Sequence, residues 1–372
     1  MNKIERMLQE LCPEGVEYKK LGEICEILRG KRLTTRDLTL DGKYPVYHGG
    51  VEPIGYYSRN NRIANSTMII NVGASAGTVG FCSVDFWSSD GCFCFTHNSD
   101  INQRYLFFVL QSMEPSIKSK VRKGGIPTLD NKDVERIIIP VPPLPIQEEI
   151  VRILDHFTEL TAVLQAKLNT ELQARQEQYE YYRNKLLTFT KIGGGTQSVT
   201  WMKMSEIAEI SSGKNRNKND IGTYPVYGST GIIAYSENFI YATPQILIAR
   251  VGANAGFVHI AVGKYDVSDN TLIVSIKDGN KYYFKYIYYL LSNMQLNKLA
   301  KGGGQPLVTA TDIKKLLVPI PSPDKQQRIV CILDKFETLV NDLSQGLPAE
   351  ITAVQEQYEY YRNKLLTFKR KA

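Results

Sequence analysis

Apolar and aromatic residues recur three or four positions apart along two segments of the chain. One seam runs from Ile150 to Phe189 and the other from Ile329 to Phe368, with the same spacings in both. Residues three and four apart share one face of an α-helix, so this heptad-like pattern predicts two long amphipathic helices. At a rise of 1.5 Å per residue, a helix of about 43 residues would be roughly 65 Å long.

The two seams belong to a duplication. The stretch QEQYEYYRNKLLTF stands at 176–189 and returns unchanged at 355–368. The same shift of 179 residues aligns PVPPLPIQEEIVRILDHFTEL (140–160) with PIPSPDKQQRIVCILDKFETL (319–339), and INVGASAGTVG (70–80) with ARVGANAGFVH (249–259). We therefore expect a first globule at 1–139, a helical segment at 140–190, a second globule at 191–318 and a second helical segment at 319–372.

Each seam is too apolar to stand alone in water, and its nearest partner is the other copy. An antiparallel pair is the simplest packing, with the globules at opposite ends about a pseudo-twofold axis. The second copy carries Gly346 and Pro348 where the first has Lys167 and Asn169. Proline breaks helix interiors but fits the first turn, so we expect the second helix to be interrupted there and to restart at Pro348.

The globules show mixed patterns. STMIINVG and PQILIARVG are typical of buried strands that enter a glycine turn, and IIIPVP, LLVPIP and TLIVSI predict further strands. RYLFFVLQSMEPSIKS (104–119) and YFKYIYYLLSNMQLNKLA (283–300) predict helices. The expected fold class is mixed α+β: two α/β globules, each with a curved sheet, separated by two long antiparallel helices in an internal duplication.

The net charge of +7 is unevenly distributed. Segments 145–190 and 323–372 hold 13 basic and 14 acidic residues, whereas the rest of the chain holds 32 basic and 24 acidic ones. A positive surplus in the globules is compatible with binding of a polyanion. No apolar run approaches the roughly 18 residues of a membrane span, and the N-terminus lacks an apolar signal region, so we expect a cytoplasmic protein.

Catalytic and metal sites find little support in the residues. Gly73–Gly77 fits the nucleophile pattern G-x-S-x-G around Ser75, but the second copy builds the same turn with Asn254. Cys92, Cys94 and His97 fall short of the four ligands of a structural zinc site. No phosphate-binding or cofactor-binding glycine motif is present, so we expect a chain that binds and scaffolds rather than catalyses.

The chain resembles the specificity (S) subunit of type I restriction–modification enzymes. The resemblance rests on PPLPIQEEIVRILDHF with PSPDKQQRIVCILDKF, on the doubled QYEYYRNKLL, and on RVGANAG with KGGGQP. It implies two target recognition domains, each reading one half of an interrupted double-stranded DNA sequence, and two helices that set the gap. It further implies two docked methyltransferase (M) subunits, joined by restriction (R) subunits. S-adenosylmethionine, ATP and magnesium would belong to these partners, and none to this chain.

Polar loops differ most between the two globules and provide the DNA-binding candidates. Arginine can read guanine, and lysine more often binds phosphate. The candidates of the first globule are Lys31, Arg32, Arg36, Arg59, Arg62, Arg122 and Lys123. Those of the second globule are Lys214, Arg216, Lys218, Arg250, Lys301 and Gln305, of which Arg250 could instead be structural.

Identity of the repeated stretch at surface positions exceeds what a helical seam requires. It suggests two equivalent docking faces for two copies of a partner, formed by Tyr179, Tyr182, Arg183 and Lys185, and by Tyr358, Tyr361, Arg362 and Lys364. Two alternatives remain: a coiled-coil scaffold without sequence-specific DNA binding, and a self-contained nuclease or methyltransferase.

Overall fold

The computed structural model describes residues 3–39, 41–189, 199–214, 222–302, 304–341 and 346–371. The chain divides into two compact units. The first comprises Met1–Leu168 and Ile351–Ala372, and the second comprises Asn169–Glu350. Each unit therefore holds one globule, the start of the helix that follows it, and the end of the helix from the other copy.

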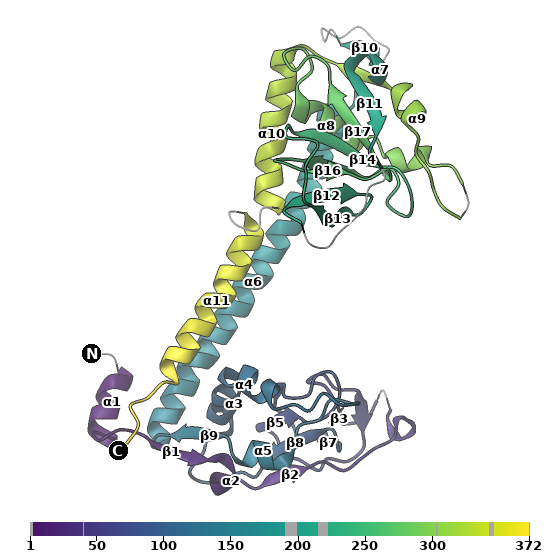
Figure 1. Ribbon diagram of the computed structural model, residues 1–372. Helices are drawn as coiled ribbons and strands as arrows, with labels where there is room; N and C mark the ends of the chain where they lie inside the picture. The colour runs from purple at the N-terminus through teal and green to yellow at the C-terminus, as the bar shows by residue number, and fades with distance from the viewer. Residues whose placement is uncertain are drawn as a thin grey trace. The chain divides into compact units, whose positions relative to one another are not determined.

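The first globule contains three small sheets (Figure 1). Their strand orders are β2-β8-β5-β6, β4-β3-β7 and β1-β9, and every pairing is antiparallel except β3 with β7. The strands are β1 (Glu17–Lys20), β2 (Ile27–Arg29), β3 (Tyr44–Tyr47), β4 (Gly55–Tyr57), β5 (Ser66–Ile70), β6 (Val79–Cys82), β7 (Trp87–Ser88), β8 (Cys92–Phe95) and β9 (Ile138–Val141). The helices are α1 (Lys3–Leu11), α2 (Leu21–Ile24), η1 (Thr35–Asp37), α3 (Gln103–Ser112), α4 (Glu114–Ser119) and α5 (Asn131–Glu135).

The second globule repeats this plan strand for strand. Its sheets have the orders β11-β17-β14-β15, β13-β12-β16 and β10-β18. The strands are β10 (Thr200–Lys203), β11 (Ala208–Ser212), β12 (Tyr224–Gly228), β13 (Gly231–Ser236), β14 (Gln245–Ala249), β15 (Val258–Ala261), β16 (Asp266–Val267), β17 (Thr271–Ile276) and β18 (Leu317–Ile320). The helices are α7 (Met204–Ile207), α8 (Phe284–Asn293), η2 (Leu296–Leu299) and α9 (Ala310–Lys314). The predicted mixed α+β class and the duplication are confirmed.

Two details of the globules differ from the sequence-based expectation. Each globule has several short sheets rather than one curved sheet, because its strands of two to six residues are separated by turns. The segment 283–300 is not one helix: α8 ends at Asn293, and Gln295 takes a left-handed conformation (φ 50°) before η2. The matching segment 104–119 also divides, with Pro115 in the first turn of α4.

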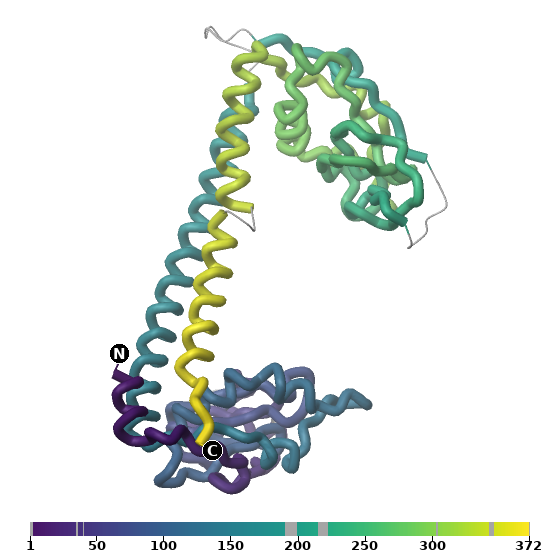
Figure 2. The backbone as a smooth tube through the Cα atoms, turned by 60° about the vertical axis from the view of Figure 1, so that its left-hand side comes forward, coloured from purple at the N-terminus to yellow at the C-terminus, as the bar shows by residue number. Residues whose placement is uncertain are grey.

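Long helices pair antiparallel inside each unit. α6 (Leu144–Leu187) is continuous over 44 residues and passes from the first unit into the second. In the first unit it lies beside α11 (Leu347–Leu365), as Figure 2 shows. Thr158 Oγ1 lies 3.0 Å from Tyr358 Oη, and Gln165 donates to Gln355 at 3.1 Å, so the numbering rises along one helix and falls along the other.

The second unit repeats this arrangement with α10 (Pro323–Asn341). The rings of Tyr179 and Tyr182 lie 6.2 and 5.7 Å from the ring of Phe336. The second copy is interrupted as predicted, since α10 ends at Asn341 and α11 begins at Leu347. Pro348 is the second residue of α11, where a proline costs no helical hydrogen bond.

The end of each repeated helix completes the core of the globule beside it. Leu366 is buried in the core of the first unit, together with Ile150 and Leu154 from the start of α6. Leu187 is buried in the core of the second unit, together with Ile329 and Leu333 from the start of α10. Both the incoming and the outgoing helix therefore bury apolar side chains in each globule.

The start of each helix is also held by a fully buried glutamine. Gln147 accepts from the amide of Asn102 (2.9 Å) and donates to the carbonyls of Asp100 (2.9 Å) and Pro142 (2.7 Å). Gln326 accepts from the amide of Tyr283 (2.8 Å) and donates to the carbonyls of Lys281 (3.1 Å) and Pro321 (2.8 Å). The side-chain amide thus satisfies three main-chain groups and fixes the helix to its own globule.

The replacement Gln147→Leu is expected to destabilise the first unit by about 2–4 kcal/mol, because it leaves those main-chain groups buried without partners. Urea unfolding followed by circular dichroism measures the change. The control Gln176→Leu, at an exposed position of the same helix, should alter stability by less than about 0.5 kcal/mol. Equal small effects of both substitutions would contradict the role given to Gln147.

Candidate nucleic-acid interface

A glycine-containing hairpin stands at the same place in each globule. In the first, Arg122 and Thr128 pair across the loop Lys123–Pro127, and in the second Lys301 pairs with Leu307. Gly125 (φ 83°) and Gly302 (φ 103°) adopt the left-handed conformation that such tight loops require. The Lys-Gly-Gly sequences therefore form matched, protruding hairpins.

Main-chain hydrogen bonds fasten each hairpin to the glycine turn that follows the buried strand β5 or β14. The amide of Gly73 donates to the carbonyl of Pro127 (2.9 Å), and the amide of Gly252 donates to that of Pro306 (3.0 Å). Gly77 and Gly256 also have positive φ, and a Cβ on Gly256 would lie 2.3 Å from a main-chain nitrogen. The shared glycines are thus explained by backbone geometry, and the Ser75/Asn254 position is part of a structural turn.

A second matched element is the basic loop after β2 or β11. The amide of Lys31 donates to the carbonyl of Ser88 (3.0 Å), and that of Lys214 donates to Val267 (3.1 Å). A Cβ on the preceding residue, Gly30 or Gly213, would meet a main-chain oxygen at 1.9 or 2.2 Å. These glycines let the loop approach the Ser-Asp turn closely, so Lys31 and Lys214 occupy equivalent positions although the sequences there align at a different shift.

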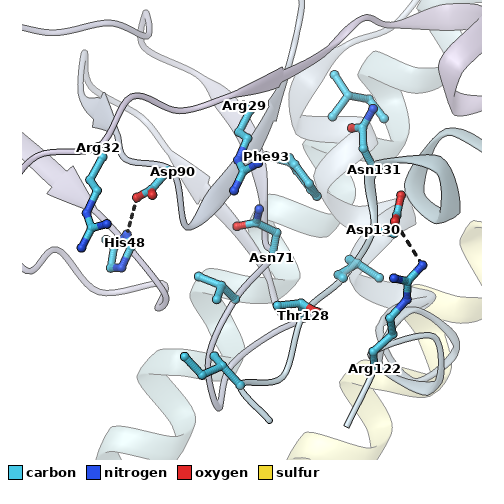
Figure 3. A pocket seen from close by; sticks show the side chains of 14 residues that line it. Arg29, Arg32, His48, Asn71, Asp90, Phe93, Arg122, Thr128, Asp130 and Asn131 are labelled. Atoms are coloured by element: carbon cyan, nitrogen blue, oxygen red, sulfur yellow. Dashed lines mark hydrogen bonds and ion pairs between the residues drawn. The ribbon is translucent and has the colours of Figure 1, made fainter. Parts of the chain in front are cut away.

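A polar cavity of about 670 Å³ lies between the hairpin and the basic loop in the first globule (Figure 3). His48 Nδ1 lies 3.3 Å from an oxygen of Asp90, and Arg122 pairs with Asp130 at 3.2 Å. The two acidic groups are therefore each matched by a basic one, which leaves a surplus of arginine. Its polar lining includes Arg29, Arg32, His48, Asn71, Asp90 and Arg122.

Most of the predicted DNA-binding side chains of the first globule are exposed. They are Lys31, Arg32, Arg36, Arg59, Arg122 and Lys123. Arg62 is placed differently: its guanidinium donates to the carbonyls of Asn61 (2.7 Å) and Arg29 (3.1 Å), and its Nε is buried. This side chain links two segments of the globule, which gives it a structural contact that the sequence did not indicate.

In the second globule Lys214, Lys301 and Gln305 are exposed, whereas Arg250 is half-buried. Lys301 pairs with Asp312 at 3.1 Å, and hydrogen bonds from Thr309 and Lys301 hold the pKa of that carboxyl below its usual value. Arg250 donates to the carbonyl of Asp269 at 3.3 Å. Arg216 and Lys218 lie outside the described residues.

Sequence reasoning missed four residues of the cavity: Arg29, His48, Asn71 and Asp90. The signal for Asn71 was present, because it aligns with Arg250 at the shift of 179 residues. Arg29 and His48 carried no such signal, since the loops that contain them differ in length and sequence between the two copies.

The predicted partner-docking residues fall into two groups. Tyr179, Tyr182, Tyr358 and Tyr361 make the helix-to-helix contacts described above or, for Tyr361, a ring contact with Phe157 at 6.1 Å. The guanidiniums of Arg183 and Arg362 lie over the rings of Tyr179 and Tyr358, and Arg183 also donates to Asn293. These side chains mainly hold the helices in place.

Lys185 and Lys364 remain exposed, and each lies near a tyrosine that the prediction omitted. Tyr181 is 58% exposed and Tyr360 is 61% exposed. Exposed residues four, seven and eight apart share one helix face. We call these two faces the docking stripes: Glu177, Tyr181, Asn184 and Lys185 on α6, and Glu356, Tyr360, Asn363 and Lys364 on α11.

No group of three or more His, Cys, Asp or Glu side chains that could hold a metal occurs among the residues that the structure describes. Cys92 and Cys94 are buried, burial raises the pKa of Cys92 to about 12, and His97 lies 2.9 Å from Ser66 Oγ. Within the same described ranges, no helix has the length and apolar character to cross a membrane.

The sequence belongs to the family of the type I restriction modification DNA specificity domain, which matches residues 13–174 and 197–353. It is 30% identical over 390 residues to a putative type I restriction enzyme specificity subunit of Haemophilus influenzae, covering 98% of this chain and all of the relative. It is 29% identical over 409 residues to the EcoR124I/EcoR124II specificity subunit of Escherichia coli, covering 99% and 97%.

Solved structures show the same fold. The HsdS subunit of Thermoanaerobacter tengcongensis superposes with a TM-score of 0.57 at 16% identity, covering 96% of this chain and 97% of the other. A chain from work on complex assembly and conformational transition of the type I R-M system gives a TM-score of 0.68 at 16% identity, covering 95% and 97%. This protein is therefore a type I restriction–modification specificity subunit with two target recognition domains, and the scaffold alternative is not favoured.

Lys123→Ala, at the exposed tip of the first hairpin, is expected to weaken DNA binding by the assembled complex about equally for all sequences. It should lower the salt slope of log K by about one, because one phosphate contact is lost. Arg62→Ala should instead lower stability, since its guanidinium joins two segments. Binding titrations over a salt series and urea unfolding separate the two effects. Arg175→Ala on α6 is the control; Arg62→Ala acting like Lys123→Ala would contradict the assignment.

Proposed function

We propose that each globule reads one half of an asymmetric, interrupted DNA target. The observation that carries the proposal is the repetition of one main-chain frame with different side chains. The sheet order, the glycine turn, the hairpin and the basic loop recur, whereas His48 corresponds to Gly228 and Asn71 to Arg250. A common frame presents equivalent elements to DNA, and different side chains recognise different base pairs, so the two half-sites should differ.

The helices are proposed to set the number of base pairs between the half-sites. Support comes from the continuity of α6 through both units and from the antiparallel contacts inside each unit. Helices transmit a fixed rise per residue, so a spacer of this kind would couple helix length to half-site separation.

The docking stripes are proposed to bind two M subunits, one on each stripe, with R subunits joining the assembly. The support is that the two stripes are identical in sequence and exposed. Exposed tyrosines beside lysines are typical of protein interfaces, because they combine a large apolar ring with a polar tip. This chain would be the non-catalytic subunit, and S-adenosylmethionine, ATP and magnesium would be bound by the partners. Because the target is DNA, we expect the complex to act in the cytoplasm of a prokaryotic cell.

Deletion of the gene is expected to remove one asymmetric, interrupted methylated motif from the methylome of the host. The reason is that M subunits without their specificity subunit have no sequence to follow. Long-read sequencing of methylated bases in strains with and without the gene makes the comparison, with re-introduction of the gene as the control. An unchanged methylome in a strain that expresses the chain and its M subunit would refute the proposal.

Tyr181→Ala and Tyr360→Ala should each weaken the docking of one M subunit by about tenfold or more, as expected for truncation of an interface aromatic. Native mass spectrometry of the co-expressed complex measures the number of M subunits per chain, and the double variant should lose both. Gln357→Ala, at another exposed position of α11, is the matched control. Retention of two M subunits by the double variant would exclude the stripes as the docking surface.

A further inference from the structure

One side-chain position is held identically in the two globules and yet carries different residues. The position directly follows strand β5 or β14 and is occupied by Asn71 in the first globule and by Arg250 in the second. The amide of Asn71 donates to the carbonyl of Gly91 (3.1 Å), and its carbonyl accepts from Leu129 (2.8 Å). The amide of Arg250 donates to the carbonyl of Asn270 (2.9 Å), and its carbonyl accepts from Val308 (2.9 Å).

These matched bonds give the two side chains the same direction. Asn71 and Asp90 both line the cavity of the first globule, as Figure 3 shows. Arg250 extends to the carbonyl of Asp269, the counterpart of Asp90 at the shift of 179 residues. Both side chains therefore point toward the Ser-Asp turn, between the hairpin and the basic loop.

The amide group of Asn71 is buried but incompletely paired. The residue is 5% exposed, and its Oδ1 has no donor from any residue that the structure describes. A buried acceptor without a partner costs about 1–3 kcal/mol. Because this acceptor lines a polar cavity of about 670 Å³, the cavity has room for a group that donates to it.

Arg250 has spare hydrogen-bonding capacity of the opposite kind. Its Nη1 makes one long hydrogen bond, at 3.3 Å, and the rest of the guanidinium donates to no group within the described ranges. A guanidinium carries five N–H donors, so most of them are available to a ligand.

We propose that this position reads one base pair in each half-site, with Asn71 recognising adenine and Arg250 recognising guanine. The asparagine amide offers an acceptor and a donor side by side, which match N6 and N7 of adenine. The guanidinium offers two parallel donors, which match O6 and N7 of guanine. The inference rests on the proposed function, and it adds the residue and the base that it reads.

The experiment compares the methylated motif of cells that express the wild-type chain or a variant together with the M subunits. Asn71→Ala should relax one A·T position in one half-site, and Arg250→Ala should relax one G·C position in the other, while the remaining half-site and the gap stay unchanged. Purified complexes should lose about 5- to 100-fold of their discrimination at that position in binding titrations with base-substituted duplexes.

A near-isosteric variant separates reading from folding. Asn71→Asp keeps the shape of the side chain but replaces the donor by a second acceptor, which matches the N4 amine of cytosine. It should shift the preference at the same position from adenine to cytosine. Asn280→Ala, at an exposed turn of the second globule, is the control and should leave the motif unchanged.

Two results would overturn the inference. One is an unchanged motif for Asn71→Ala, Asn71→Asp and Arg250→Ala, which would mean that water satisfies Asn71 and that the position is structural. The other is complete loss of methylation for all three variants although the complex assembles at the wild-type level. If the wild-type gene itself directs no methylated motif, the proposed function fails, and that outcome is recognised before any variant is compared.

Discussion

The main-chain hydrogen bonds between the glycine turn and the hairpin are the constraint on which the recognition surface depends. They join Gly73 to Pro127 in the first globule and Gly252 to Pro306 in the second, with nearly equal lengths. Bonds of this kind use only amide and carbonyl groups, so the side chains on the loops can change without loss of the frame. The glycines themselves cannot change as freely, because positive φ and close backbone contacts exclude a side chain there.

A second constraint connects each frame to its helices. Gln147 and Gln326 satisfy three main-chain groups each, and the ends of the repeated helices bury Leu366 and Leu187 in the two cores. Inside a unit, the reading loops are therefore fixed relative to the helix that carries a docking stripe. This rigid connection is what a specificity subunit needs, because a methyltransferase must be placed at a defined distance from the bases that are read.

The sequence revealed the features that repeat, and it was weaker on those that do not. The spacing of apolar residues predicted the helices and their antiparallel pairing, and Pro348 predicted the interruption of the second one. Self-alignment separated structural glycines from the false nucleophile Ser75. The same method failed for Arg62, because whether an arginine binds DNA or a carbonyl of its own chain depends on distant segments.

The docking stripes and the cavity show the same limit in another form. Tyr179 and Tyr182 were predicted to face a partner, but the antiparallel neighbour covers part of that face and leaves Tyr181 exposed instead. Helical periodicity gives the relative directions of side chains, whereas the orientation of the helix about its axis is set by packing. The cavity was beyond sequence reasoning because its lining comes from separate loops that only the folded sheet order brings together.

The most direct test of the central claim is a chimera in which residues 21–137 are replaced by residues 204–316, so that both globules carry the second set of loops on the shared frame. The methylome of cells that express this chimera with the M subunits should contain a motif made of two copies of one half-site, the one read by the second globule. A motif with two different half-sites, produced by a chimera that assembles normally, would contradict the account.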